Sequence, residues 1–301
     1  MSAAAPGAWA LEPFGLQAWP TARKLLLRCY PCTPPALWDA GIERLRRVPS
    51  SRAGEPIGML LQGQQGPLGL ALLLASWRPV AGAPARRHVN GSSWAIVPSA
   101  RDRALWMARH GMADMQTVYT ALTPIPSTLR ILQRIGFAAA THQCVLAATP
   151  RLAWQAAASR ARQPEVRAGR DALHALRDDP LAPALHDHVQ LGCEVLALQS
   201  ERGVQGWAPL VFRPQQRLGW LRTAELMYAP SQAQLAQQAP ALAAPLLRRG
   251  YAMLALDMHQ DLAPSFPSTR LFQRRFVRGP AAADASAGVD HLYSELVYLH
   301  R

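Results

Sequence analysis

The chain has 301 residues, half of them hydrophobic, which is enough for two domains with substantial buried cores. Its formal net charge is +13, and a basic surface attracts polyanions such as nucleotides, nucleic acids and acidic proteins. The basic residues are dispersed and no aromatic-and-basic RNA-binding motif occurs, which argues against direct nucleic-acid binding. No uncharged apolar stretch is long enough to span a bilayer, and the N-terminus lacks the pattern of a secretion signal. We therefore expect a cytoplasmic protein without a membrane partner.

The first part of the chain contains a tail, two helices and two strands. Residues 1–17 are expected to form a loose tail. The patterns then predict helices from Thr21 to Arg28 and from Pro35 to Arg47, the second with a stripe of Trp38, Ile42 and Leu45. Strands are predicted at Ile57–Gln62 and Pro67–Trp77, around a hairpin signal, and a Pro- and Ala-rich loop at residues 78–88.

Four cysteines restrict metal and redox chemistry. Cys29 and Cys32 have the spacing of a zinc or redox pair, but no second pair completes a zinc site. They follow a helical run, whereas a thioredoxin-like pair would follow a strand and open a helix. We interpret them as incidental thiols, and Cys144 and Cys193, in apolar runs, as small core residues. No metal site is predicted.

The stretch from Val89 to Phe137 has the clearest order of elements. Ser92–Val97 reads as a strand that ends at Pro98, which lacks an amide hydrogen. A helix follows, with an apolar stripe at Ala104, Leu105, Ala108 and Met112. Met115–Leu122 reads as a strand, and Ser127 is suited to cap a helix that Gly136 ends. An apolar run at 137–147 is the expected last strand of this domain.

The rest of the chain shows a change of composition and then a second set of elements. Residues 150–183 are rich in Ala, Arg and Pro and are interpreted as a linker with one or two helices. Strands are then predicted at Leu191–Gln199, Trp207–Phe212, Gly219–Tyr228, Tyr251–Asp257 and Leu292–Leu299, with a long helix at Ser231–Arg249.

The Val89–Phe137 stretch resembles the second half of the GCN5-related N-acetyltransferase fold. The resemblance depends on the strand ending Ile96-Val97-Pro98, the turn at Arg101, the helix after it and the ending Leu132-Gln-Arg-Ile-Gly-Phe137. In that family the turn has the pattern Arg/Gln-x-x-Gly-x-Gly/Ala, and its amides hold the pyrophosphate of coenzyme A. Free amides and the helix dipole favour anions. The resemblance implies acetyl-CoA or another acyl-CoA as co-substrate, bound by Ile96, Val97, Arg101, Asp102, Arg103, Ala104 and Leu105.

This turn departs from the family pattern at two positions. Ala104 stands in place of the first Gly, and Trp106 in place of the second small residue. The order of elements after residue 190 coarsely repeats the first set, as in tandem-domain bacterial members of the family. Its turn, Tyr228–Ala233, has neither the Arg nor the glycines, so the second domain is not expected to bind coenzyme A.

The fold class predicted is α/β (α+β), with two tandem domains of this type, each a mixed, mostly antiparallel sheet flanked by helices. The domains are expected at residues 18–150 and 184–301, with the linker at 151–183 between them. The function predicted is acyl-CoA-dependent transfer to an amine of a small molecule or peptide. The alternative is a catalytically inactive protein of this fold that binds a ligand or partner. Neither the acyl length nor the oligomeric state is predicted.

The usual catalytic side chains of the family are not visible in the sequence. The strand at 92–97 has no carboxylate, and Ser127 is the only hydroxyl well placed at the start of the later helix. Asp257, His259 and Asp261 alternate where a strand enters a loop, which is the simplest explanation for them; binding of a metal or a cationic acceptor is the alternative. Glu225 and Glu295, if buried, require partners, for which Arg274 and Arg275 are candidates.

Overall fold

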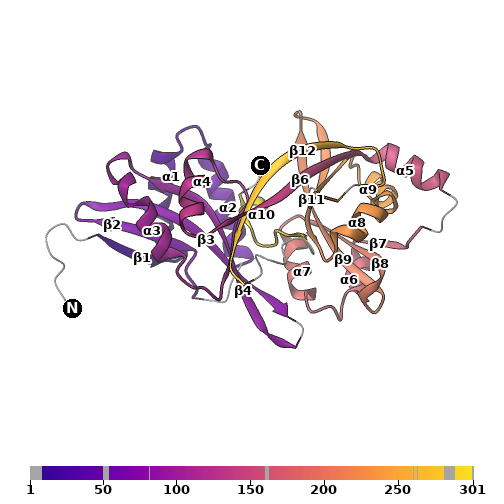
Figure 1. Cartoon of the computed structure of the whole chain (residues 1–301), viewed down its shortest axis with the longest axis horizontal. Helices are drawn as coiled ribbons and strands as arrows, with labels where there is room; N and C mark the ends of the chain where they lie inside the picture. Colours follow the sequence, from indigo (N-terminus) through magenta and orange to yellow (C-terminus); the bar gives the residue numbers. More distant parts are fainter. Residues whose placement is uncertain are drawn as a thin grey trace. The chain divides into compact units, whose positions relative to one another are not determined.

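The structure, a computed structural model, describes residues 9–49, 54–80, 82–159, 163–259, 261–262, 264–280 and 289–299 (Figure 1). The chain divides into two compact units, each discontinuous in sequence. Unit 1 comprises Met1–Ala139, Arg275–Ala282 and Tyr293–Arg301, and unit 2 comprises Ala140–Arg274 and Ala283–Leu292. Among the described residues, no helix combines the length and the apolar character required to cross a membrane.

Unit 1 contains a mixed sheet in the order β1-β2-β3-β4-β5-β12, of which the last strand contributes only its end. Among the described residues of this sheet, the β4–β5 pair is parallel and the other pairs are antiparallel. The strands are β1 (Ala10–Phe14), β2 (Gly58–Gly63), β3 (Gly66–Val80), β4 (Ala83–Ile96), β5 (Val118–Ala121) and β12 (Thr269–Arg278). The main helices are α1 (Trp19–Cys29), α2 (Pro35–Arg47), α3 (Ala104–Gly111), α4 (Pro126–Arg134) and α10 (Glu295–Tyr298).

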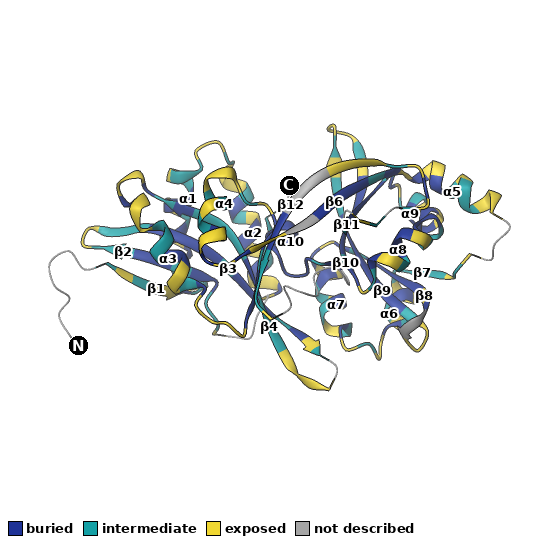
Figure 2. Ribbon diagram, viewed as in Figure 1, coloured by how far each residue is buried: buried dark blue, intermediate teal, exposed yellow. Residues whose placement is uncertain are grey.

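The core of unit 1 forms where helices α3 and α4 cover the sheet. Ala108 of α3 and Leu132 of α4 cluster with Val89 and other buried strand residues, together with Met112 and Ile135, which directly follow the two helices. Their spacing of three or four residues places them on one face of each helix. The predicted apolar stripes are therefore the faces that the helices bury. Figure 2 shows long buried stretches in strands such as β3, whereas β1 and the outer part of β4 are more exposed.

Unit 2 contains a second mixed sheet in the order β6-β11-β10-β9-β8-β7. Again one pair, β10–β11, is parallel and the others are antiparallel. The strands are β6 (Ala138–Ala148), β7 (Val166–Ala168), β8 (Glu194–Val204), β9 (Trp207–Arg217), β10 (Leu221–Ala229), β11 (Met253–His259) and the short β13 (Val289–Asp290). The helices are α5 (Thr149–Ala158), α6 (Arg170–Ala175), α7 (Ala182–Gln190), α8 (Gln232–Gln238) and α9 (Ala243–Arg248).

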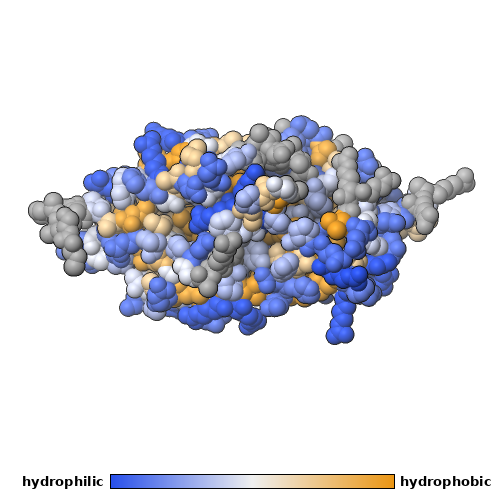
Figure 3. Space-filling model, turned by 90° about the horizontal axis from the view of Figure 1, so that it is seen from below, coloured by the Kyte–Doolittle hydropathy of each residue, from blue (hydrophilic) through white to orange (hydrophobic). Residues whose placement is uncertain are grey.

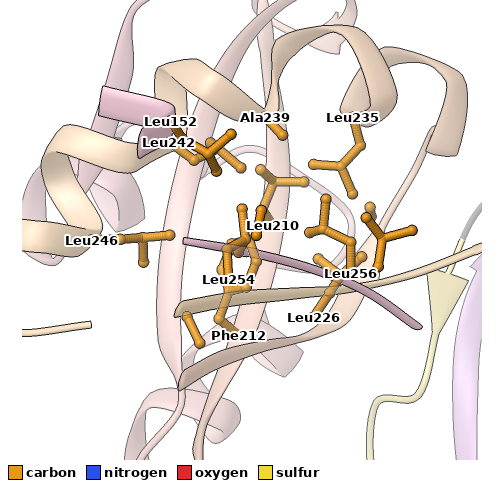
Figure 4. Close-up of a cluster of buried hydrophobic side chains, with 14 of the residues drawn as sticks. Leu152, Leu210, Phe212, Leu226, Leu235, Ala239, Leu242, Leu246, Leu254 and Leu256 are labelled. Carbon is orange, nitrogen blue, oxygen red and sulfur yellow. The ribbon is translucent and has the colours of Figure 1, made fainter. Parts of the chain in front are cut away.

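Leucine is the most frequent residue in the core of unit 2, which the sheet and the helical segments of α5 and of residues 232–248 form together (Figure 4). Leu152 of α5 is fully buried there with Leu242 and Leu246. The sheet supplies the facing residues Leu210, Phe212, Leu226, Leu254 and Leu256. On the molecular face drawn in Figure 3, apolar residues form separate patches within a mostly hydrophilic surface.

The two units repeat one order of elements. In each, three consecutive antiparallel strands are followed by a helical crossover, and the next strand runs parallel to the third. The predicted fold class, two tandem domains with mixed, mostly antiparallel sheets flanked by helices, is confirmed.

Several predicted elements are wrong in detail. Within the tail predicted at 1–17, residues 10–14 form β1, while residues 1–8 lie outside the described part of the chain. The loop predicted at 78–88 is mostly strand, because β3 and β4 continue as a long hairpin. Residues 292–299 form a turn and α10 instead of a strand, and strand β12 was not predicted.

The helix predicted at Ser231–Arg249 is broken. It forms α8, a 3₁₀ helix at Ala239–Leu242 and α9, with Pro240 in the 3₁₀ segment. Proline removes a backbone donor and interrupts an α-helix. The start is as predicted, because the Ser231 hydroxyl accepts from the Gln234 amide at 3.2 Å.

Candidate functional site

The parallel strands β4 and β5 separate soon after they meet. They pair only from His88–Val118 to Asn90–Thr120. Beyond Asn90, β4 continues to Ile96 but no longer pairs with β5. Strand β5 ends at Ala121, and the chain turns away before α4. The edge of β4 facing β5 therefore carries backbone groups that the β5 ladder does not use.

A β-bulge distorts β4 within this opening. Opposite β3, Leu72 pairs with Ser92 while Leu70 pairs with Ala95, so Ser93 and Trp94 together face one residue, Ala71. Ser93 has a φ of 41°, in the left-handed region that side chains seldom adopt. A bulge redirects backbone groups and side chains, and bulges are frequent next to binding sites.

A cavity of about 90 Å³ lies in this opening, within unit 1. Most of the residues that line it are apolar, such as Leu132 and Phe137, and several others carry a hydroxyl group. The lining hydroxyl residues are Tyr30, Ser92, Ser93, Thr120, Thr123 and Thr128. Such an apolar cavity with a few polar groups is typical of small-ligand sites.

Tyr30 reaches the cavity from the C-terminal end of α1. Its hydroxyl donates to the carbonyl of Trp94, on the bulge, at 2.7 Å. Burial, and then the neighbouring Cys29, raise the pKa of Tyr30 to about 12, so the phenol remains protonated at neutral pH. No local sequence pattern points to Tyr30, because its place at the cavity depends on the contact between the end of α1 and a strand residue 64 positions away.

The segment after β4 is a continuous helix rather than an open turn. A 3₁₀ helix, η2 (Pro98–Arg103), runs directly into α3. The amide of Ala100 donates to Val97 at 3.0 Å and that of Ala104 donates to Arg101, and the 3₁₀ pattern engages the amides between them. These amides are therefore already bonded within the protein, unlike the free amides of a helix N-terminus.

The seven residues predicted to hold a cofactor lie outside the cavity lining. Ile96 ends β4 and Val97 follows it, while the other five, residues 101–105, lie at the end of η2 and the start of α3. The amide of Val97 donates to Leu68 at 2.9 Å. The guanidinium of Arg103 lies 3.1 Å from Asp102 and 5.3 Å from the ring of Trp9. Arg101 is exposed. The Trp106 ring lies against His110, one turn later on α3, with centroids 4.4 Å apart.

Ser127 is exposed on the first turn of α4, and its predicted role as N-cap is wrong. The helix begins at Pro126, and Ile125 is the N-cap residue. The next residue, Thr128, lines the cavity and donates its hydroxyl to the Ile125 carbonyl at 2.9 Å. Proline at the first helical position explains the earlier start.

In unit 2, another segment of the chain pairs with the corresponding edge of β10. Strands β10 and β11 pair from Thr223–Met253 to Glu225–Ala255, after which β13 pairs with β10 through Tyr228–Asp290 and Ala229–Val289. Val289 belongs to the core of unit 2. A short strand of this chain thus uses the edge that is open on β4.

Asp257, which we predicted at a strand end, is buried between two histidines. Its carboxylate oxygens lie 2.9 Å from His142 Nδ1 and 2.7 Å from His291 Nε2. His259 Nδ1 lies 3.3 Å from Asp261 on the more exposed side. Within the described residues, no three or more His, Cys, Asp or Glu side chains are grouped as metal ligands.

The partner predicted for Glu225 is wrong. This buried carboxylate pairs with Arg213 on the adjacent strand β9, because the antiparallel register places the two residues opposite each other. Glu295 accepts a hydrogen bond from Thr123. Arg275 donates to the Leu122 carbonyl, and the side chain of Arg274 lies outside the described residues.

No protein-family model and no curated protein matches the sequence. Among solved structures, the chain is similar to a GCN5-related N-acetyltransferase from Kribbella flavida, with a TM-score of 0.56 and 13% identity over 95% of this chain and 75% of that one. It is similar to another from Anabaena variabilis, with a TM-score of 0.56 and 11% identity over 90% and 72%. A conserved protein of unknown function from Enterococcus faecalis, described as a probable N-acyltransferase, has a TM-score of 0.54 and 10% identity over 90% and 72%.

These matches define the class of fold. The chain has the fold of the GCN5-related N-acetyltransferases, and the predicted resemblance is confirmed at this level. Because the matches cover at least 90% of the chain, the likeness extends over both units.

Proposed function

We propose that unit 1 is an acyl-CoA-dependent acyltransferase that acylates an amine of a small molecule or peptide. The observation that carries the proposal is the opening between parallel strands β4 and β5, with its bulge and apolar cavity. An extended ligand placed there can bond the part of β4 beyond Asn90, which β5 does not pair with, as an added strand would. The apolar walls suit an acyl group.

Two features of the chain support transfer as well as binding. Bound acyl-CoA supplies a thioester carbonyl, which backbone amides at the bulge are suited to polarise. The Tyr30 hydroxyl lies on the cavity wall with its pKa raised to about 12, so it is a protonated group beside the site at neutral pH. It is our candidate for protonating the leaving thiolate.

The fit to the phosphates of coenzyme A depends on side chains. The amides of η2 that would hold a pyrophosphate in the family pattern donate within the helix. Arg101 is the exposed cation of η2. Arg103 instead forms an ion pair with Asp102 and lies over the ring of Trp9. Arginine bonds phosphate through a charge-assisted fork, so we assign Arg101 as the main phosphate contact.

Calorimetric titration with acetyl-CoA and with longer acyl-CoAs tests the proposal. We expect binding of at least one of them, followed by release of free thiol when a panel of primary amines is added. Absence of binding to every acyl-CoA at millimolar concentration would overturn it.

A second candidate is a catalytically inactive protein of this fold that binds a ligand or partner. It is favoured by the engaged amides of η2 and by the absence of any carboxylate from the cavity lining, as far as the described residues show. Acyl-CoA binding without thiol release, over a broad amine panel, would favour this candidate.

A further inference from the structure

The carboxylate of Glu295 is hydrogen-bonded to a residue that lines the cavity of unit 1. Helix α10 (Glu295–Tyr298) places Glu295, which is 7% exposed, beside the loop after β5. The hydroxyl of Thr123, which lines the cavity, donates to Glu295 Oε1 at 3.1 Å. The Thr123 hydroxyl therefore connects the cavity to a buried acidic group that is 172 residues away in sequence.

A second connection holds Glu295 at the same place. The Glu295 amide donates to Asn90 Oδ1 at 2.9 Å, and Asn90 Nδ2 donates to Thr120 Oγ1 at 3.1 Å. Thr120 also lines the cavity, and Asn90 is the last residue of β4 that pairs with β5. The carboxylate is thus positioned against the point where the two strands separate.

Cations on three other elements contact this segment or its neighbours. Arg44 of α2 donates to the Tyr298 carbonyl at 2.6 Å, Arg78 of β3 lies over the Tyr293 ring, and Arg275 of β12 donates to Leu122, next to Thr123. These contacts connect α10 and the loop after β5 to three other elements of unit 1. A carboxylate oxygen held in this way, one hydrogen bond from the cavity wall, is suited to accept a proton.

We propose that Thr123 and Glu295 form a proton relay that deprotonates the amine acceptor, an inference that rests on the proposed acyltransferase function of unit 1. A proton leaves the ammonium nitrogen for Thr123 Oγ1 as the hydroxyl proton passes to Glu295 Oε1. The amine lone pair then forms the C–N bond, and the C–S bond breaks with its electrons on sulfur. Sulfur takes a proton from Tyr30, the second proton of the nitrogen restores the phenol, and Glu295 releases its proton to solvent. Thr123 contacts the acceptor, and Glu295 acts through it.

The relay is tested in the full chain with acetyl-CoA and a panel of primary amines, by following thiol release. Thr123→Val removes the hydroxyl with little change of shape, and Thr123→Ser keeps it. We expect Thr123→Val and Glu295→Gln each to lower kcat/KM by about 100-fold, the lower end of the general-base contribution. Thr123→Ser should retain most of the activity, and the KM for acetyl-CoA should stay unchanged in all three variants.

The pH profile separates a relay from a structural role. Without the relay, only amine that is already neutral reacts, so the rate of Glu295→Gln should rise with pH toward the amine pKa more steeply than that of the parent. A structural role would lower the rate by the same factor at every pH. Glu43→Gln, at an exposed carboxylate that pairs with Arg46, is the matched control and should behave as the parent.

The outcomes distinguish the two proposals. If the parent binds acetyl-CoA and transfers the acyl group, but Thr123→Val or folded Glu295→Gln keeps the parent's rate and pH profile, the relay is overturned and the function stands. If the parent transfers to no amine, both are overturned. Because Thr123→Val and Glu295→Gln both alter a hydrogen bond to a buried group, the melting temperature of each is measured. Thr123→Ser, which keeps the bond, is the reference for folding.

Discussion

At the scale of single residues, the proposed phosphate site depends on Arg101. The amides of η2 bond within the helix, so a bound phosphate would depend on the exposed guanidinium. We expect Arg101→Ala to weaken acyl-CoA binding about tenfold at low salt, as for loss of one charge-assisted hydrogen bond at an exposed site. The effect should shrink at high salt because exposed charges are screened.

Calorimetry on Arg101→Ala and on Arg109→Ala measures this difference. Arg109 is an exposed arginine in the last turn of α3 and should bind as the parent does. Equal affinities in the parent and Arg101→Ala would remove η2 from the phosphate site.

The reactivity of Cys29 reports on the charge of Arg101, because that charge acts on the thiol. Burial raises the pKa of this thiol, whereas the charges of Arg28 and Arg101 oppose the rise. Loss of Arg101 should raise the pKa further and leave less thiolate at pH 8. We expect alkylation of Cys29 to slow a few-fold in Arg101→Ala, measured in a Cys32→Ser background because Cys32 is exposed. Faster alkylation would show that Arg101 does not stabilise the thiolate.

At the scale of elements, the sequence predicts those whose pattern is local. Helix α2 has the predicted limits, Pro35 and Arg47, because Pro opens it and one apolar stripe runs along it. Prediction from local patterns fails where tertiary contacts determine the secondary structure. The segment at 78–88 contains Pro and Ala, which strands disfavour, yet it extends β3 and β4 through cross-strand pairing.

Helix α5 shows the same limit of composition-based prediction. Its Ala-rich sequence suggested a linker, but Leu152 is fully buried in the core of unit 2. Leu152→Ala should therefore cost about 2–5 kcal/mol of unfolding free energy, as large-to-small substitutions in a core do. Trp154→Ala is the control on the same helix, because this side chain is 74% exposed.

Chemical denaturation of the two variants provides the measurement. We expect a clear loss of stability for Leu152→Ala and little change for Trp154→Ala. Two equally small effects would mean that α5 behaves as a linker.

At the scale of the whole molecule, the site could be predicted only in part. The sequence indicated the strand and helix around Arg101, which are neighbours along the chain. Tyr30, Thr123 and Glu295 meet around one cavity only in the folded unit, through contacts that no local pattern records. Unit 1 also includes two C-terminal segments, so a fragment of residues 1–150 lacks the strand end that pairs with β5 and the helix that bears Glu295.

The repeat of the fold in two units raises the question of how many acyl-CoA molecules one chain binds. The openings differ in the described residues, because β10 is paired with β13 where no strand pairs with the corresponding edge of β4. Displacing β13 would expose Val289, which is buried in the core of unit 2, and would break the hydrogen bond between His291 and Asp257. We therefore expect a single site per chain, in unit 1.

Calorimetric titration of the full chain should accordingly yield a stoichiometry of one acyl-CoA. Gly91 allows a matched test, because it lines the cavity and a Cβ placed there would meet only the Thr120 carbonyl, at an ordinary contact distance of 3.5 Å. Gly91→Leu should fill the cavity and abolish binding, whereas Gly91→Ala should retain it, with similar melting temperatures for both. A stoichiometry of two, or binding that persists in folded Gly91→Leu, would place a site elsewhere in the chain.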